Sequence, residues 1–384
     1  MLIYLDNSAT SFPKPEAVYR AVDSAFRDCG ANPGRGGHRM SLDASRLVFS
    51  ARETIADFFS IADASRLIFT SGATEAINTA LFGLLNPGDH VVTTAMEHNS
   101  VLRPLRVLEK SGVSLSIVDA DASGSVSASS IAAACTDATR MVVMTHCSNV
   151  TGTLMPIETV GEFCRGKNLL FLVDAAQTAG HIPIDVDALG VDLLALPGHK
   201  GLFAPPGIGC LYVREGVPLR PLIHGGTGGQ SEQDEMPLQM PERFESGTLN
   251  TPGIAGLKAG IEFITEVGLN AIMAHEQQLV DLLVRGLNSI DGVTVYGKAG
   301  SGHHGGAVSF TCQNRDPSEI GFILDQDYDI MVRVGLHCAP GAHRMIGTFP
   351  AGTVRVSPGY FTTIDQIELL IQAVHKISLG QNRF

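Results

Sequence analysis

The sequence lacks the cysteine patterns that would define a disulfide scaffold or a zinc ribbon. Its 384 residues contain seven cysteines, and no two of them stand in C-x-x-C spacing. An odd count without paired spacing argues against a disulfide framework, and a reducing cytoplasm is the expected compartment.

The sequence also lacks basic blocks and long apolar runs. The formal net charge is −12, so we expect no nucleic acid partner. Apolar runs such as 169–173 fall far short of the roughly 20 residues that a membrane span needs. The first ten residues, MLIYLDNSAT, show no basic region ahead of an apolar one, so no signal peptide is expected.

The composition is that of a soluble globular protein, with 44% hydrophobic and 17% charged residues. A single core rarely grows beyond about 250–300 residues. We therefore predict a large domain over residues 1–262 and a smaller C-terminal domain over residues 263–384, entered through a long helix that starts near residue 256.

Short apolar runs alternate with helical patterns through the first half of the chain. The runs are RLIFTS (66–71), HVVTTA (90–95), LSIVDA (115–120), RMVVMTHC (140–147), LLFLVDA (169–175) and DLLALPG (192–198), with GIGCLYV (207–213) after them. This alternation predicts an α/β fold with a mostly parallel sheet covered on both faces. Ligands bind such sheets outside the carboxyl ends of the strands, where Ser71, Asp174 and Lys200 fall.

Lys200 is the most informative residue of the chain. It follows an apolar strand that stops at Pro197 and Gly198, and Gly201 follows it. Glycines near a lysine have no side chain, so the backbone can approach its amine closely, as a Schiff-base lysine requires. Asp174 ends another strand; it could simply cap the next helix. Together, however, a lysine and an acid at neighbouring strand ends are what pyridoxal phosphate (pyridoxal 5'-phosphate) requires, the acid to hold the pyridine nitrogen protonated.

Two further positions carry candidate chemistry. Thr74 lies between a strand and a helix, where free N–H groups and the helix dipole suit a phosphate, although it could merely cap the helix. Cys338, in GLHCAPG, is a loop thiol with Arg333 and Arg344 nearby, and positive charge favours the reactive thiolate. The rival interpretation, a zinc site made of His337, Cys338 and His343, would need three ligands from one short loop.

The other cysteines lie in apolar or helical contexts. We expect them to be small core residues: Cys29, Cys135, Cys147, Cys164, Cys210 and Cys312.

With these residues in view, the chain resembles the class V aminotransferase family, and within it the cysteine desulfurase group that includes selenocysteine lyases. The resemblance runs from Tyr4 to Gly359. It rests on motifs that follow one another in order: TSGATEAIN (70–78), MEHNS (96–100), SNVTG (148–152), VDAAQ (173–177), GHK (198–200), FESGTLNT (244–251) and RVGLHCAP (333–340).

The resemblance implies the fold type I architecture of pyridoxal phosphate enzymes, with a smaller α+β C-terminal domain, and a role for each matching residue. Lys200 carries the cofactor, Asp174 pairs with its ring nitrogen, and Gln177 bonds its ring hydroxyl. The phosphate is held by Ala73 and Thr74 with help from His199, and by Thr248 of the neighbouring subunit of a homodimer. His98 stacks on the ring and relays protons, although a lone histidine is more often structural; Asn149 contacts the same ring edge or the substrate.

For the substrate, the resemblance implies that Arg355 binds the carboxylate of L-cysteine, or of L-selenocysteine; on the residues alone a structural ion pair is as good an interpretation. Arg35 and His38 shape the entrance. Cys338 takes the sulfur as a persulfide, leaving L-alanine, and passes it to a sulfur-acceptor protein. The chain departs from the family at Pro197, where many relatives carry a phosphate-binding serine.

Three alternatives stay open at this point. The chain could be a selenocysteine lyase or another class V enzyme, a non-catalytic sulfur carrier, or a zinc-binding protein. The residues do not distinguish service to iron–sulfur cluster assembly, thiolated tRNA or selenium handling.

Overall fold

The computed structural model describes residues 2–34, 36–228, 232, 234–297 and 305–381. Its centre is a seven-stranded sheet in the order β2-β8-β7-β6-β5-β3-β4. The strands from β7 through β4 run parallel, whereas β8 is antiparallel to both of its neighbours. The prediction of a mostly parallel α/β sheet is therefore confirmed.

The strands of this sheet are short and nearly all buried, as expected for a sheet with both faces covered. They are β2 (Leu67–Thr70), β3 (His90–Thr94), β4 (Ser114–Val118), β5 (Thr139–Thr145), β6 (Leu170–Asp174), β7 (Leu193–Pro197) and β8 (Gly209–Val213).

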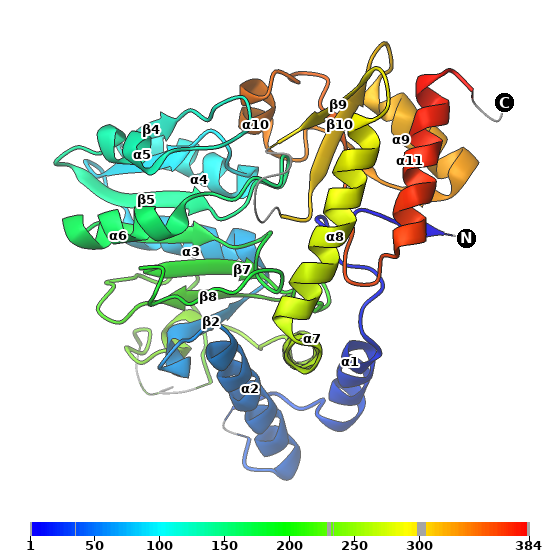
Figure 1. The fold of residues 1–384 in the computed structure, drawn as a ribbon. Helices are drawn as coiled ribbons and strands as arrows, with labels where there is room; N and C mark the ends of the chain where they lie inside the picture. Colours follow the sequence, from blue (N-terminus) through cyan, green and yellow to red (C-terminus); the bar gives the residue numbers. More distant parts are fainter. Residues whose placement is uncertain (1, 35, 229–231, 233, 298–304, 382–384) are drawn as a thin grey trace.

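Helices cover both faces of the sheet (Figure 1). One face packs on α3 (Ala73–Leu84) and α4 (Asn99–Lys110). The other face packs on the remaining helices of this part of the chain, and two 3-10 turns lie at 64–66 and 242–244. Those helices are α1 (Glu16–Asp28), α2 (Arg39–Phe58), α5 (Ala128–Ala134), α6 (Ile157–Lys167) and α7 (Thr251–Val267).

A second layer forms around a four-stranded antiparallel sheet in the order β12-β13-β10-β9. Its strands and helices all come from the last third of the chain. They are α8 (Leu269–Asn288), β9 (Val293–Tyr296), β10 (Val308–Cys312), α9 (Pro317–Tyr328), β11 (Ile330–Met331), β12 (Arg333–Gly335), β13 (Thr353–Val356) and α11 (Ile364–Ser378). The short helix α10 (Pro340–Met345) comes from the same part of the chain, but its buried residues join the hydrophobic cluster of the large sheet.

The N-terminal strand joins this second layer (Figure 1). Strand β1 (Ile3–Tyr4) pairs in parallel with β11, and Ile3 and Leu5 are buried in the same hydrophobic cluster as α8 and α11. The first residues therefore tie the two ends of the chain together, a pairing that the sequence patterns did not indicate.

The long linking helix predicted from residue 256 is in fact two helices. It begins earlier, at Thr251, and ends at Gly268, whose φ of 90° breaks the helix before α8 begins. Among the described helices, none combines the length and the apolarity needed to cross a bilayer.

Candidate active site

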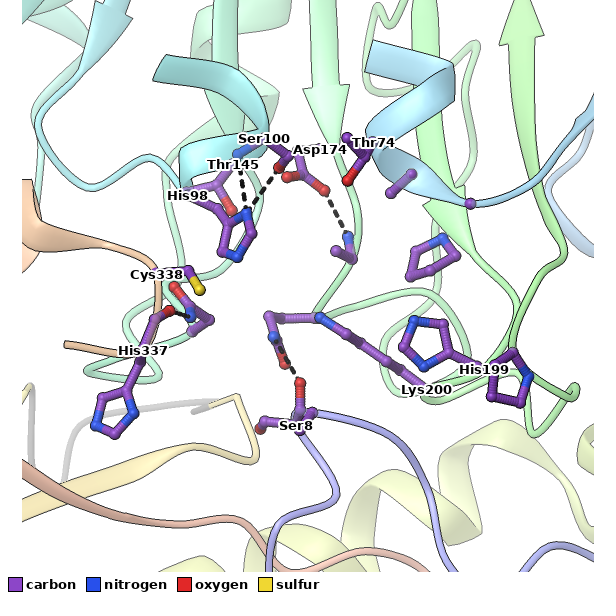
Figure 2. Close-up of a pocket in the computed structure, with 18 of the residues that line it drawn as sticks. Ser8, Thr74, His98, Ser100, Thr145, Asp174, His199, Lys200, His337 and Cys338 are labelled. Carbon is purple, nitrogen blue, oxygen red and sulfur yellow. Dashed lines mark hydrogen bonds between the residues drawn. The ribbon is translucent and has the colours of Figure 1, made fainter. Parts of the chain in front are cut away.

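A cavity of about 410 Å³ opens at the carboxyl ends of the parallel strands (Figure 2). Figure 2 shows Lys200 and Cys338 on opposite sides of this pocket, with His98 on the Cys338 side. Ten of the residues proposed from the sequence line it: Ala73, Thr74, His98, Asn149, Asp174, Gln177, His199, Lys200, Cys338 and Arg355. Parallel strands bring these residues together because their carboxyl ends meet at one edge of the sheet.

The Lys200 turn depends on the glycines beside it. A Cβ at Gly198 would lie 2.8 Å from the Ala204 side chain, and one at Gly201 would lie 2.4 Å from the Ala179 carbonyl oxygen. Only glycine fits where the backbone passes this close. The turn places the Lys200 amine in a desolvated pocket, and burial lowers its pKa to about 8 while the nearby Asp174 partly opposes that shift.

Asp174 lies at the end of β6 with 2% of its surface exposed. One carboxylate oxygen accepts a 2.9 Å bond from the Ala176 N–H, so the side chain closes a local turn rather than capping a helix. Burial raises its pKa, and Lys200 and the Ala176 bond oppose the rise. A positive charge placed beside this carboxyl group would favour its ionised form.

The first turn of α3 faces the same pocket. Gly72, not Thr74, is the N-cap, so the capping interpretation of Thr74 is wrong. Thr74 is exposed to the pocket, and the first N–H groups of a helix have no acceptor within it. This geometry suits an anion.

Pro197 lines the pocket wall near that turn. It offers neither a hydroxyl nor an N–H group. Beside it, the Nδ1 atom of His199 is buried and has no hydrogen-bond partner among the described residues. Burial and the neighbouring Lys200 and Lys14 charges lower the pKa of His199 to about 4. A neutral ring can present either nitrogen as a donor.

His98 has a structural role as well as a place in the pocket. Its Nδ1 accepts a 3.0 Å bond from the Ser100 N–H at the start of α4, and lies 2.8 Å from the Ser100 hydroxyl. Burial, with Lys200, Arg355 and Arg103, lowers its pKa to about 4. Because Nδ1 accepts, the proton of the neutral ring is on Nε2.

The neighbouring Glu97 is fully buried and has a structural role that the sequence interpretation missed. Its Oε1 accepts bonds from the Thr94 hydroxyl (2.7 Å) and the Thr145 N–H (3.0 Å), and burial raises its pKa to about 8. It thus holds the segment that carries His98 against β5. The available signal was an acid that stands directly before the histidine, just after the run HVVTTA (90–95).

Cys338 lies on a short loop between β12 and α10 and is exposed. His337 and Cys338 both have left-handed φ values, 48° and 58°, a conformation that costs non-glycine residues energy. Two hydrogen bonds hold this strained loop. The Asn149 amide donates to the His337 carbonyl at 2.7 Å, and the Asn99 N–H donates to the Cys338 carbonyl at 2.8 Å.

The six remaining cysteines differ from Cys338. Four of them, Cys147, Cys164, Cys210 and Cys312, are buried, as predicted. Cys29 and Cys135 are half-buried, so the core prediction was too broad for these two.

Arg355 lies on β13 and is 2% exposed. Its guanidinium donates to Asp6 at 2.7 Å and to the Asn149 carbonyl at 3.1 Å, and Asp6 also pairs with Arg333 at 3.2 Å. Both arginines line the pocket. The sequence interpretation gave no role to Asp6, because the pairing of β1 with β11 that brings it here joins segments more than 300 residues apart. Gln177 and Ser8 also line the pocket, and the Gln177 amide donates to the Ser8 carbonyl at 3.2 Å.

Two proposed residues do not line this pocket. His38 is exposed and caps α2, accepting a 3.3 Å bond from the Ser41 N–H. Thr248 is also exposed. It follows Glu245, which Arg52 grips with both terminal nitrogens at 2.8 Å. Arg35 lies outside the described residues.

His337 and His343 pack against each other with ring centroids 5.4 Å apart. Each meets a threonine hydroxyl, of Thr353 at 3.0 Å and of Thr348 at 2.7 Å. Within the described ranges, no group of three or more metal-ligating side chains gathers here or elsewhere.

A lysine and a buried acid at adjacent strand ends, facing a helix N-terminus, define the site of a fold type I enzyme. The family described as Aminotransferase class-V matches residues 3–370, and this chain belongs to it. It is similar to a probable cysteine desulfurase of Methanothermobacter thermautotrophicus, with 38% identity over 98% of this chain and 94% of that protein.

Solved structures agree with this membership. The cysteine desulfurase of Thermococcus onnurineus NA1 superposes with a TM-score of 0.92 at 35% identity, covering 99% of this chain and 95% of that one. The cysteine desulfurase CsdA of Escherichia coli gives 0.88 at 26% identity, covering 99% and 95%. The predicted family and fold are therefore confirmed.

Proposed function

We propose that this protein is a pyridoxal phosphate-dependent cysteine desulfurase that converts L-cysteine to L-alanine and carries the sulfur on Cys338. The observation that carries the proposal is the pocket itself. It sets a half-buried lysine and a buried aspartate at strand ends across from an exposed cysteine. The names of the relatives support the same activity.

The donor set fits the cofactor. Lys200 would carry it, Asp174 would pair with its ring nitrogen, and the phosphate would meet Ala73 and Thr74 at the N-terminus of α3. When bound, pyridoxal phosphate supplies an electron sink that stabilises negative charge at the substrate α-carbon. The buried Nδ1 of His199 supports a role for this side chain in replacing the contact that Pro197 does not provide.

His98 and Gln177 complete the ring environment in this proposal. The neutral His98 ring presents its Nε2 proton toward the pocket, where it would pack on the cofactor ring. Gln177, held by its bond to Ser8, would meet the ring hydroxyl, and Asn149 the same edge or the substrate.

Arg355 would bind the substrate carboxylate, with Arg333 beside it. Asp6 occupies part of the Arg355 guanidinium in the structure and holds it in place. Lys200, whose pKa is about 8, can take a proton from the substrate α-carbon once it is free. His38 would act at the entrance.

The sulfur step uses the Cys338 thiolate as nucleophile. It attacks the sulfur of bound cysteine and forms an S–S bond as the substrate C–S bond breaks. The electron pair of the broken bond stays with the β-carbon, which takes up a proton to give alanine. The sulfur remains on Cys338 as a persulfide, ready for a sulfur-acceptor protein.

We further propose a homodimer in which Thr248 contacts the phosphate of the neighbouring subunit. Two observations support this contact. Thr248 is exposed and lies away from the pocket of its own chain, and the Arg52–Glu245 ion pair anchors the segment that carries it. We also propose that the chain divides into a large domain (1–262) and a smaller C-terminal domain (263–384), and that the protein is cytoplasmic.

The test is product analysis. Purified protein loaded with pyridoxal phosphate should form alanine from L-cysteine, and mass spectrometry should find an added sulfur on the Cys338 peptide. The absence of both products would refute the proposal. Parallel assays with L-selenocysteine distinguish the lyase alternative, which predicts turnover of the selenium substrate only.

A further inference from the structure

A second cavity, of about 580 Å³, lies on the outer side of the Cys338 loop, between α4 and α10. Four cations line it, together with one acid, Asp119. The cations are Arg103, Arg106, Lys110 and Arg344. All four are exposed on a chain whose net charge is −12, so this groove is opposite in sign to the molecule as a whole. One of the charges, Arg106, is partly balanced by Glu109 at 2.8 Å.

The groove also carries apolar surface. Val107 is 51% exposed, and Leu102, Ile117 and Met345 are half-buried along its wall. The Arg344 guanidinium lies 4.4 Å from the centroid of Phe349, which is itself exposed. Arginine, aromatic and aliphatic side chains together are typical of protein interfaces.

The groove is fixed relative to the reactive thiol. The Asn99 N–H, in the first turn of α4, bonds the Cys338 carbonyl at 2.8 Å. The start of α10, which follows the Cys338 loop directly, is held just as closely. A Cβ at Gly341 would lie 2.3 Å from the Ala95 carbonyl oxygen, so α10 packs directly on the backbone before α4. A partner seated in the groove therefore lies next to Cys338.

We propose that the groove between α4 and α10 is the docking surface for an acidic segment of the sulfur-acceptor protein, seated so that its thiol reaches Cys338. This rests on the proposed desulfurase function. In the transfer, the acceptor thiolate attacks the outer sulfur of the Cys338 persulfide. A new S–S bond forms on the acceptor, the bond to Cys338 breaks, and Cys338 leaves as a thiolate, with no external oxidant or reductant.

The experiment compares two synthetic peptides, each with one cysteine, flanked by glutamates in one and by lysines in the other. The persulfidated holoenzyme should transfer sulfur to the acidic peptide faster, by roughly tenfold at low salt, and the difference should shrink as salt rises. Arg106→Glu/Lys110→Glu should remove the preference. Lys167→Glu/Lys376→Glu, which changes the net charge equally at the ends of α6 and α11, should leave it intact.

Arg103 and Arg344 are left unchanged because Arg103 influences the pKa of His98 and Arg344 adjoins the Cys338 loop. With dithiothreitol as acceptor, the rate of alanine formation should be the same in the wild-type protein, the groove variant and the Lys167→Glu/Lys376→Glu control. If the Glu variant folds poorly, since it places a new carboxylate beside Glu109, Arg106→Gln/Lys110→Gln replaces it.

A preference for the acidic peptide that survives the groove substitutions would overturn the proposal. The proposal would also be overturned if sedimentation showed that the groove variant no longer self-associates, because the groove would then lie between copies of this chain. If wild-type protein forms no alanine with dithiothreitol, the proposed function fails instead. The groove is then tested by fluorescence anisotropy with serine in place of the peptide cysteine, and binding must still depend on Arg106 and Lys110.

Discussion

The side chains proposed to react lie in two different surroundings. We call Asp174, Lys200 and His98 the floor of the pocket, and Cys338 its rim. On the floor, burial raises the pKa of Asp174 and lowers those of Lys200 and His98, so all three are shifted toward their neutral forms. On the rim, Cys338 is exposed and lies on a strained loop whose carbonyls accept bonds from the Asn149 side-chain amide and the Asn99 N–H.

This difference separates two chemical requirements. Proton transfer near neutral pH needs groups whose pKa values are tuned, and desolvation does this most strongly. A thiol that must receive sulfur and give it away needs access from both the pocket and the solvent. The following predictions test that separation, beginning with the largest expected effect.

Lys200→Ala should lower the rate of alanine formation by roughly 10²–10⁴-fold or more, because in the proposed function this amine both carries the cofactor and moves the proton. Borohydride treatment of the wild-type holoenzyme should fix the cofactor on the peptide containing Lys200. Label on another lysine, or protein that stays colourless after reconstitution, would contradict the assignment of the floor.

Cys338→Ser should reduce alanine release from L-cysteine to near background while leaving the fold and the bound cofactor intact. A hydroxyl is a far poorer nucleophile toward sulfur than a thiolate. L-Selenocysteine should be less affected, because its selenium can leave with less help. Normal cysteine turnover in this variant would eliminate the persulfide step.

The matched control is Cys164→Ala, which removes a buried thiol from α6. It should lower the free energy of unfolding by about 1 kcal/mol and leave turnover per folded molecule unchanged. The pair contrasts an exposed cysteine with a buried one in the same chain.

The rate at which the apoprotein captures pyridoxal phosphate should rise with pH and level off above about 8. Only the neutral amine has a lone pair, and the pKa of Lys200 is about 8, so the rate should fall about tenfold per pH unit below that value. Stopped-flow absorbance measures it. A midpoint near 10.5 would show that burial does not tune the floor.

Thr74→Ala should weaken cofactor binding about tenfold or more, since a lost hydrogen bond to a charged group is worth roughly 1.5–3 kcal/mol. Because Pro197 offers no contact, the hydroxyl matters more here. Equilibrium dialysis provides the affinity, and Thr74→Ser, which keeps the hydroxyl, should restore it. Equal loss in both variants would point to helix packing instead.

Thr248→Ala should weaken cofactor retention several-fold, although Thr248 lies outside the pocket of its own chain. Sedimentation should show that the variant is still a dimer. A fully active wild-type monomer would refute the cross-subunit contact.

The sequence by itself determined the parallel sheet and the residues of the floor. Buried parallel strands read as short apolar runs, so Asp174 and Lys200 were visible as residues at or just after strand ends. The motifs also identified Cys338 as the cysteine unlike the others. Local patterns carry this information because the geometry of a strand end is itself local.

Only the tertiary structure decided what surrounds those residues. The bond between Asp6 and Arg355 depends on a pairing of the first strand with the C-terminal layer, which no local pattern encodes. The structure also shows that Gly72 rather than Thr74 caps α3 and that Gly268, with a φ of 90°, divides the long helix. Burial sets the pKa of Lys200, and burial exists only once distant segments of the chain have packed around the amine.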